Sequence, residues 1–74
     1  MEYMKRIVSD LDIMLGKPII KGTRITVVLI LRKISEGMTI EELLGAYPRL
    51  IREDILAAIS YSADVIASEE LIAP

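Results

Sequence analysis

The sequence contains no cysteine and no histidine, and these two absences exclude several kinds of functional site. Without cysteine the chain has no disulfide, no thiolate zinc site and no thiol nucleophile. Without histidine it has no imidazole base, no Ser-His-Asp triad and no histidine-ligated metal. We therefore expect a protein that is not an enzyme, with no catalytic residue, no metal and no cofactor.

Aromatic residues are scarce as well. Phenylalanine and tryptophan are absent and there are three tyrosines, so the core must be aliphatic. The chain has 74 residues, which predicts a single domain, residues 1–74, that buries about 60% of its surface. Hydrophobic residues make up 53% of this small chain, and a monomer of this size cannot easily bury all of their surface. We therefore expect a homodimer, with the strand edges within residues 5–25 as the natural contact.

Long uncharged runs are also lacking. The longest, Ile55–Ala63, has nine residues, whereas a membrane-spanning helix needs about 18. The N-terminus shows no apolar leader with a cleavage site. The sequence therefore predicts a cytoplasmic protein with no membrane contact.

The charge that is present is unevenly distributed along a chain whose net charge is −2. Residues 1–35 hold seven basic and three acidic residues, and residues 36–74 hold two basic and eight acidic ones. Such asymmetry can mark a half that binds a polyanion, and it is also common by chance in a short chain. The acidic pI of about 5.0 favours a protein without a nucleic-acid role, because dedicated DNA-binding domains usually run basic.

The spacing of apolar residues predicts a mainly α fold in which a short N-terminal β element precedes three helices. Lys5–Val8 and Ile19-Ile20 are strand-like, and Gly16-Lys17-Pro18 between them is a turn signal. We therefore expect three parts: a β arm or hairpin over residues 1–25, a helical bundle over residues 26–67 and a tail over residues 68–74.

Three segments of the bundle follow helical spacing. The first has Thr26 as its N-cap and Gly37 after its end, and the second begins with the capping box Thr39-Ile40-Glu41-Glu42. The third starts near Ile51 and runs to about Ala63 or beyond. The residues expected to face inward are Val27, Ile30, Leu31, Ile34 and Met38, then Ile40, Leu43, Leu44 and Tyr47, and finally Ile55, Ala58, Ile59 and Ser62.

Two stretches carry a resemblance to a known family. One is Gly16-Lys17-Pro18 followed by Gly22-Thr23-Arg24-Ile25, and the other runs from Glu36-Gly37-Met38-Thr39 to Tyr47-Pro48 and Asp54-Ile55. Together they resemble domain-of-unknown-function family 433, small antitoxin-like prokaryotic proteins, over about residues 5–65. The resemblance implies a helix-turn-helix-like bundle, a dimer, and a partner that resembles a PIN-domain ribonuclease. Ile51 departs from the family pattern, since relatives usually place a capping Ser or Thr there.

The implied helix-turn-helix would consist of residues 39–47 and 52–63, with the second helix in the major groove of DNA. Its outward residues would be Arg52, Glu53, Leu56, Ala57, Ser60 and Asp64. Among these only Arg52 favours DNA, and Arg49 in the turn could contact the phosphate backbone. The alternative is a helical core with a solvated outer face.

The basic N-terminal half offers a second way to contact DNA. Lys21 and Arg24 lie on the β arm, and in a dimer two such arms could lie against phosphates. The alternative is that Lys21 flanks a turn for solubility and that Arg24 pairs with an acidic residue of the helical half.

The C-terminal end combines apolar and acidic residues, which suits contact with a protein. Val65 and Ile66, followed by Leu71 and Ile72, could lie in a groove of a partner while Glu69 and Glu70 meet a basic rim. The first candidate partner is the PIN-like ribonuclease toxin that the resemblance implies, and the alternative is a frayed tail that binds nothing.

Two functions remain as hypotheses from the sequence. The first is an antitoxin-type regulator, a dimeric helix-turn-helix-like DNA-binding module that neutralises a PIN-like ribonuclease toxin. The second is a small non-enzymatic protein-interaction module with no nucleic-acid role.

Overall fold

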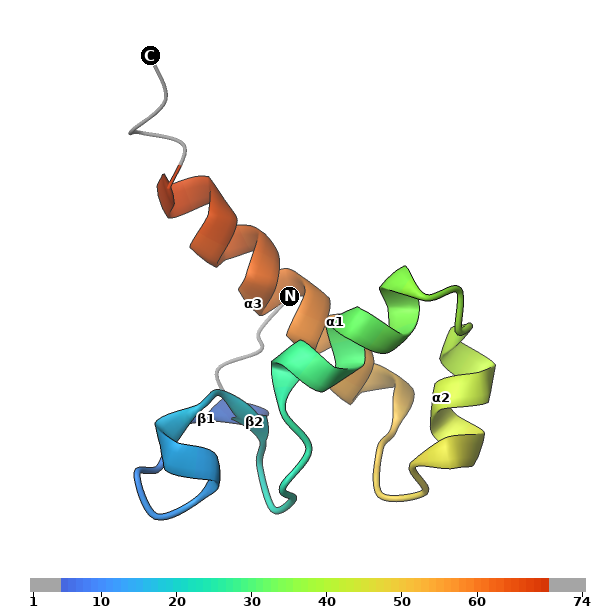
Figure 1. The fold of residues 1–74 in the computed structure, drawn as a ribbon, viewed down its shortest axis with the longest axis horizontal. Coiled ribbons are helices and arrows are strands. Elements are labelled where there is room, and N and C mark those ends of the chain that lie inside the picture. The colour runs from blue at the N-terminus through green and yellow to red at the C-terminus, as the bar shows by residue number, and fades with distance from the viewer. Residues whose placement is uncertain (1–4, 70–74) are drawn as a thin grey trace.

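The computed structural model describes residues 5–69, and it confirms a mainly α fold with a short β element at the N-terminal side (Figure 1). The elements in chain order are β1 (Ile7–Val8), the 3-10 turn η1 (Met14–Gly16), β2 (Ile19–Ile20), α1 (Val27–Ser35), α2 (Ile40–Ala46) and α3 (Arg52–Glu69). No helix within residues 5–69 is long and apolar enough to cross a membrane.

β1 and β2 form the predicted hairpin. They pair antiparallel, with Ile7 opposite Ile20 and Val8 opposite Ile19. All four residues are β-branched, which suits a pleated and half-buried surface. The Lys21 amide extends the ladder by donating to the Arg6 carbonyl at 2.8 Å. Ile19 and Ile20 are almost fully buried, so β2 anchors the hairpin to the helices.

The predicted helix starts are confirmed for α1 and α2. The Thr26 hydroxyl accepts a hydrogen bond from the Leu29 amide at 3.0 Å, as an N-cap does. Thr39 and Glu42 form the complete capping box: the Glu42 amide donates to the Thr39 hydroxyl at 3.1 Å, and the Thr39 amide donates to the Glu42 carboxylate at 2.8 Å. α1 ends before Gly37, whose φ of 100° lies in the left-handed region that glycine tolerates best.

These hydrogen bonds change the acidity of Glu42. The Thr39 amide first, and the Thr39 hydroxyl second, hold the pKa of the Glu42 carboxyl below its ordinary value of 4.5. A carboxyl with a lowered pKa stabilises the fold above its ordinary value, and that contribution is lost as the pH falls through the lowered one. The capping box is therefore strongest when Glu42 is ionised, and protonation of Glu42 in acid weakens it.

Replacing Thr39 with alanine is expected to lower the free energy of unfolding by about 1 kcal/mol, because the amide at the start of α2 loses its acceptor. Urea denaturation followed by far-UV circular dichroism measures the change. Ser35→Ala is the matched control, since the Ser35 hydroxyl only donates to the Arg32 carbonyl within its own helix. Equal losses of unfolding free energy in the two variants would show that the capping box does not stabilise α2.

α3 differs from its prediction in length and in orientation. It runs to Glu69, so Ser68 and Glu69 belong to the helix rather than to the predicted tail, and residues 70–74 lie outside the described residues. The prediction that Ala57 faces outward is wrong, since it is 0% exposed. The prediction that Ile59 faces inward is also wrong, since it is 41% exposed.

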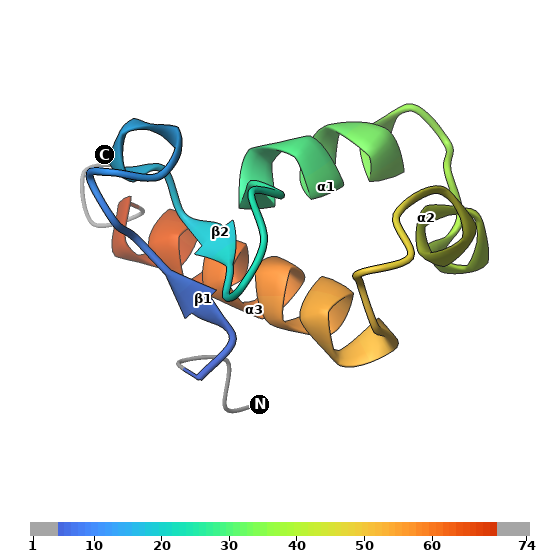
Figure 2. The same ribbon diagram turned by 90° about the horizontal axis from the view of Figure 1, so that it is seen from below.

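The reason for both errors is that α3 packs on three elements, α1, α2 and β1, rather than on one. Its buried residues, Asp54, Ile55, Ala57 and Ala58, form a wider face than a single stripe. Figure 2 shows α3 running along α1 and past the hairpin, with α2 at the end of the molecule away from the hairpin. A small residue such as Ala57 permits the close approach, and the larger Ile59 is left on the rim.

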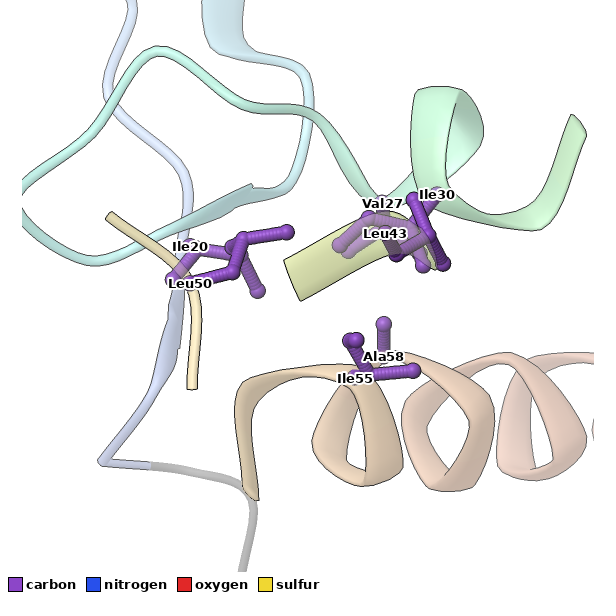
Figure 3. Packing of buried hydrophobic residues seen from close by; sticks show 7 residues of the cluster. All are labelled: Ile20, Val27, Ile30, Leu43, Leu50, Ile55 and Ala58. Atoms are coloured by element: carbon purple, nitrogen blue, oxygen red, sulfur yellow. The ribbon is translucent and has the colours of Figure 1, made fainter. Parts of the chain in front are cut away.

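The core is aliphatic, as the scarcity of aromatic residues predicts. It draws on every part of the chain between β2 and α3, and its buried members are Ile20, Val27, Ile30, Leu43, Leu50, Ile55 and Ala58 (Figure 3). Ile30, Leu43 and Ile55 are each 0% exposed and come from α1, α2 and α3 respectively. The three helices are therefore held together by one shared cluster.

Candidate functional site

A cleft of about 830 Å³ opens where the hairpin meets two turns, the β2–α1 turn and the α2–α3 turn. These two turns lie at the same end of the molecule, at the bottom of Figure 1. The cleft is lined by Val8, Ser9, Asp10, Ile13, Ile19, Lys21, Gly22, Thr23, Arg24, Ile25 and Arg49. Three of the four predicted DNA-binding residues, Lys21, Arg24 and Arg49, are among them, so we name it the cationic cleft.

The β2–α1 turn has a fixed shape because its own groups hold it. The Thr23 hydroxyl donates to the Ile20 carbonyl at 2.7 Å and accepts from the Ile25 amide at 2.9 Å. Gly22 has a φ of 80°, and a Cβ there would meet no atom within 4 Å, so the backbone conformation rather than space requires glycine. The turn therefore presents Lys21 and Arg24, both exposed, from a rigid support.

Arg49 joins this turn from a distant part of the sequence. Its Nη2 atom donates to the Gly22 carbonyl at 2.7 Å, across 27 residues of chain. The next residue, Leu50, is buried in the core, and its amide donates to the Tyr47 carbonyl at 2.9 Å. Arg49 is thus held at the base of a packed turn, with its guanidinium reaching over the cleft.

The cations of the cleft are not neutralised by acidic side chains. Within residues 5–69 the ion pairs are Arg6–Asp54, Lys33–Glu36 and Arg52–Glu41. Lys21, Arg24 and Arg49 take part in none of them. The only carboxylate that lines the cleft is that of Asp10, which accepts a hydrogen bond from the Asp12 amide at 2.8 Å. The cleft therefore carries three cationic groups against one carboxylate and suits an anion.

The predicted grouping of Arg49 with Arg52 does not form at this site. Arg52 does not line the cleft, and its Nη1 atom lies 3.7 Å from a carboxylate oxygen of Glu41 on α2. The alternative prediction is that Arg24 pairs with an acidic residue of the helical half. Within residues 5–69 Arg24 forms no ion pair. Arg49, predicted to contact DNA as part of the helix-turn-helix, thus shares one surface with Lys21 and Arg24, predicted to contact DNA from the β arm.

The predicted protein-binding residues Val65 and Ile66 lie on a second surface, a shallow groove of about 310 Å³ between α1 and α3. We name it the α1–α3 groove. It is lined by Pro18, Val27, Val28, Leu31, Tyr61, Ser62, Val65 and Ile66. The Ser62 hydroxyl donates to the Ala58 carbonyl at 2.7 Å, so the lining is almost wholly apolar. Leu71 and Ile72 lie outside the described residues.

Two features of the site escaped the sequence analysis. The Arg6 guanidinium lies 3.2 Å from the Asp54 carboxylate, which fixes the hairpin against the start of α3. The loop between β1 and β2 exposes Leu11 and Leu15. The turn residues around them predict a loop but not which of its side chains are exposed. No group of three potential metal ligands occurs within the part of the chain that the structure describes.

The fold and the cleft define a small three-helix protein with an N-terminal hairpin, and the comparisons place it in a family. The family model described as protein of unknown function, DUF433, matches residues 7–62, which is most of the chain. The chain therefore belongs to the DUF433 family.

Among solved structures, the chain is similar to the crystal structure of a DUF433 member protein from Anabaena variabilis. The two chains share 29% sequence identity with a TM-score of 0.81, over 96% of this chain and 71% of that one. No curated protein matches the chain.

Proposed function

We propose that this chain is a cytoplasmic, dimeric, non-enzymatic regulator of the antitoxin type that binds the phosphate backbone of DNA through the cationic cleft. The observation that carries the proposal is the convergence of Lys21, Arg24 and Arg49, from two turns, on a surface where no ion pair engages them. Lysine and arginine side chains that lie outside any ion pair at a rigid concave surface are groups that contact phosphates.

The proposed DNA contact differs from the usual helix-turn-helix arrangement. In that arrangement the second helix reads bases in the major groove. Here Glu41 engages Arg52, and the exposed side of α3 carries Glu53 and Asp64, whose charges repel phosphates. Contacts from turns to the backbone fix position and carry little sequence information. We therefore propose binding that depends weakly on sequence and strongly on salt.

The antitoxin part of the proposal concerns a PIN-like ribonuclease as the partner. Its support is the resemblance that the sequence carries, which implies such a partner, together with a surface that can meet a protein. The catalytic centre of such a nuclease is a cluster of carboxylates, so Arg24 and Arg49 of the cationic cleft are suited to cover it. One cleft would then serve two anionic partners in turn, DNA phosphates and the acidic centre of the toxin.

Replacing Lys21, Arg24 and Arg49 together with alanine is expected to weaken binding to a labelled duplex and to flatten its salt dependence. Each lost phosphate contact lowers the slope of log K against log salt by about 0.9, so three contacts lower it by about 3. Fluorescence anisotropy over a range of salt concentrations measures both quantities.

The control for this experiment is a variant that removes cations elsewhere, Lys33→Ala with Arg52→Ala, because both side chains lie in ion pairs outside the cleft. It leaves the cleft intact and is expected to keep most of the slope. Because Arg49 also supports a turn, the double variant Lys21→Ala with Arg24→Ala is measured alongside and should lower the slope by about 2. Equal changes in the control and cleft variants would refute a cleft-specific contact.

The second candidate function is a protein-interaction module with no nucleic-acid role. The α1–α3 groove favours it, because Val28, Val65 and Ile66 expose apolar surface there at 46%, 41% and 60%. Adjoining apolar residues that remain this exposed mark contact surfaces. A chain that binds no duplex at low salt, with its cleft intact, would support this second function over the first.

A further inference from the structure

The loop between β1 and β2 exposes apolar side chains to an unusual degree. Leu11 and Leu15 are 84% and 87% exposed, and Met14 between them is 39% exposed. Single exposed leucines are ordinary, but three large apolar side chains within five residues form a patch. We name Leu11, Met14 and Leu15 the apolar loop tip.

The backbone of this loop is held in a costly conformation. Met14 and Leu15 have φ angles of 51° and 59°, in the left-handed region that residues other than glycine avoid. Hydrogen bonds within the loop maintain it: the Ile13 amide donates to the Asp10 carbonyl at 2.8 Å, and the Lys17 amide donates to the Met14 carbonyl at 3.2 Å. Strain that is kept in this way is typical of functional segments. The tip is therefore preorganised to present its leucines.

The Leu11 side chain lies close to the turn that carries Leu15. A Cβ on Gly16, whose φ is 83°, would lie 3.1 Å from the Cδ2 atom of Leu11. Leu11 is thus positioned by the backbone of the residue that follows Leu15, and both leucines remain exposed on the same loop.

We propose that the apolar loop tip of one chain docks into the α1–α3 groove of a second copy of this chain. The tip is apolar and convex, and the groove is apolar and concave. Each copy carries both surfaces, so one two-fold contact buries two tips and two grooves in a closed pair. None of the three tip residues and none of the residues that line the α1–α3 groove lines the cationic cleft.

The arrangement of the two surfaces suits a two-fold axis. Figure 1 shows the loop that contains η1 below the start of α1 and the outer half of α3, along the same side of the molecule. A two-fold rotation reverses the order along that side. In the proposed pair this brings the loop of each copy to α1 and α3 of the other.

Charge at the rims agrees with this docking. Asp12 lies within the loop, exposed, and Arg32, also exposed, follows the groove residue Leu31 and lies one helical turn after the groove residue Val28. Neither side chain takes part in an ion pair within residues 5–69. In the proposed pair Asp12 of each copy meets Arg32 of the other, which sets the register of the contact.

Sedimentation equilibrium of the full chain tests the proposal. The unaltered protein is expected to be a dimer at tens of micromolar. The double variant Leu11→Ser with Leu15→Ser should raise the dimer dissociation constant about 100-fold or more, because four leucines lose their burial. Thermal melting confirms that the variant folds, which its exposed positions favour. Leu56→Ser, which removes an exposed leucine away from both surfaces, is the control and should leave the dimer intact.

A charge exchange tests the register directly. Asp12→Arg and Arg32→Asp should each weaken the dimer, and the two together should restore it. A monomer at every concentration, an unchanged dissociation constant in the leucine variant, or no restoration in the exchanged pair would each overturn the proposal. None of these results depends on whether the chain binds DNA.

Discussion

Replacing Ile55 with alanine is expected to lower the free energy of unfolding by about 2–5 kcal/mol, the range for large-to-small changes in a packed core. Ile55 is 0% exposed and lies in the cluster that α1, α2 and α3 share (Figure 3). A domain of 74 residues has about 4–11 kcal/mol of stability in all. The variant is therefore expected to be partly or wholly unfolded at room temperature.

Ile59→Ala is the matched control for Ile55→Ala. It makes the same chemical change one helical turn later, at a side chain that is 41% exposed. Its loss should stay near 0.5 kcal/mol, since little burial is removed and alanine favours a helix. Urea denaturation followed by far-UV circular dichroism compares the two. Similar losses at the two positions would mean that α3 turns a different face to the core.

The contrast between Ile55 and Ile59 also shows what the sequence could not decide about α3. Apolar spacing places both isoleucines on one face, but α3 packs on α1, α2 and β1 together, and Ile55 is buried while Ile59 is 41% exposed. Ala57 was assigned to the outside for the same reason, because a small residue contributes little to a hydrophobic pattern. The buried face of α3 is set by tertiary contacts with the hairpin and the other helices, and the spacing of apolar residues in the sequence cannot predict these contacts.

The features that the sequence predicted correctly are the local ones. The N-cap at Thr26, the capping box at Thr39 and the turn at Gly37 each depend on groups within four residues of one another. The hairpin also follows from two β-branched pairs that flank a turn signal. Local chemistry determines such features in any tertiary setting, so the pattern is sufficient to find them.

The candidate site was predicted in its residues but not in its assembly. Lys21, Arg24 and Arg49 were all named as cations for DNA, yet in two separate groups. Their meeting rests on a hydrogen bond from Arg49 to Gly22 that spans 27 residues. The apolar loop tip is not predicted from the sequence. Asp10, Asp12 and Gly16 indicate a turn, but they do not determine which side chains that turn exposes.

Replacing Asp54 with alanine is expected to cost about 2–3 kcal/mol, the second large effect on stability. Asp54 is 7% exposed, and its carboxylate serves two parts of the chain. One oxygen accepts from the Ile51 amide at 3.0 Å, which is the half of a capping box that the third helical residue supplies at the start of α3. The other accepts from the Arg6 guanidinium at 3.2 Å, across 48 residues. The variant loses both contacts at once.

Three further variants separate these two roles of Asp54. Asp54→Asn keeps an oxygen for the Ile51 amide and loses the charge that holds Arg6, so its cost should fall near 1 kcal/mol. Arg6→Ala should cost about 1 kcal/mol or less, because the Arg6 side chain is 37% exposed and its pair is screened by water. Glu53→Ala, at the exposed acid next in sequence, should change stability by no more than about 0.5 kcal/mol.

A double-mutant cycle between Arg6→Ala and Asp54→Ala then measures how the hairpin is coupled to α3. The Arg6 carbonyl also accepts a hydrogen bond from the Lys21 amide. The Arg6–Asp54 ion pair therefore fixes the hairpin strand that leads into the cationic cleft. A coupling energy of about 0.5–1 kcal/mol is expected for a partly exposed ion pair on a buried carboxylate. A coupling of zero, or a cost for Asp54→Ala no larger than that of Glu53→Ala, would show that Asp54 holds neither α3 nor the hairpin in place.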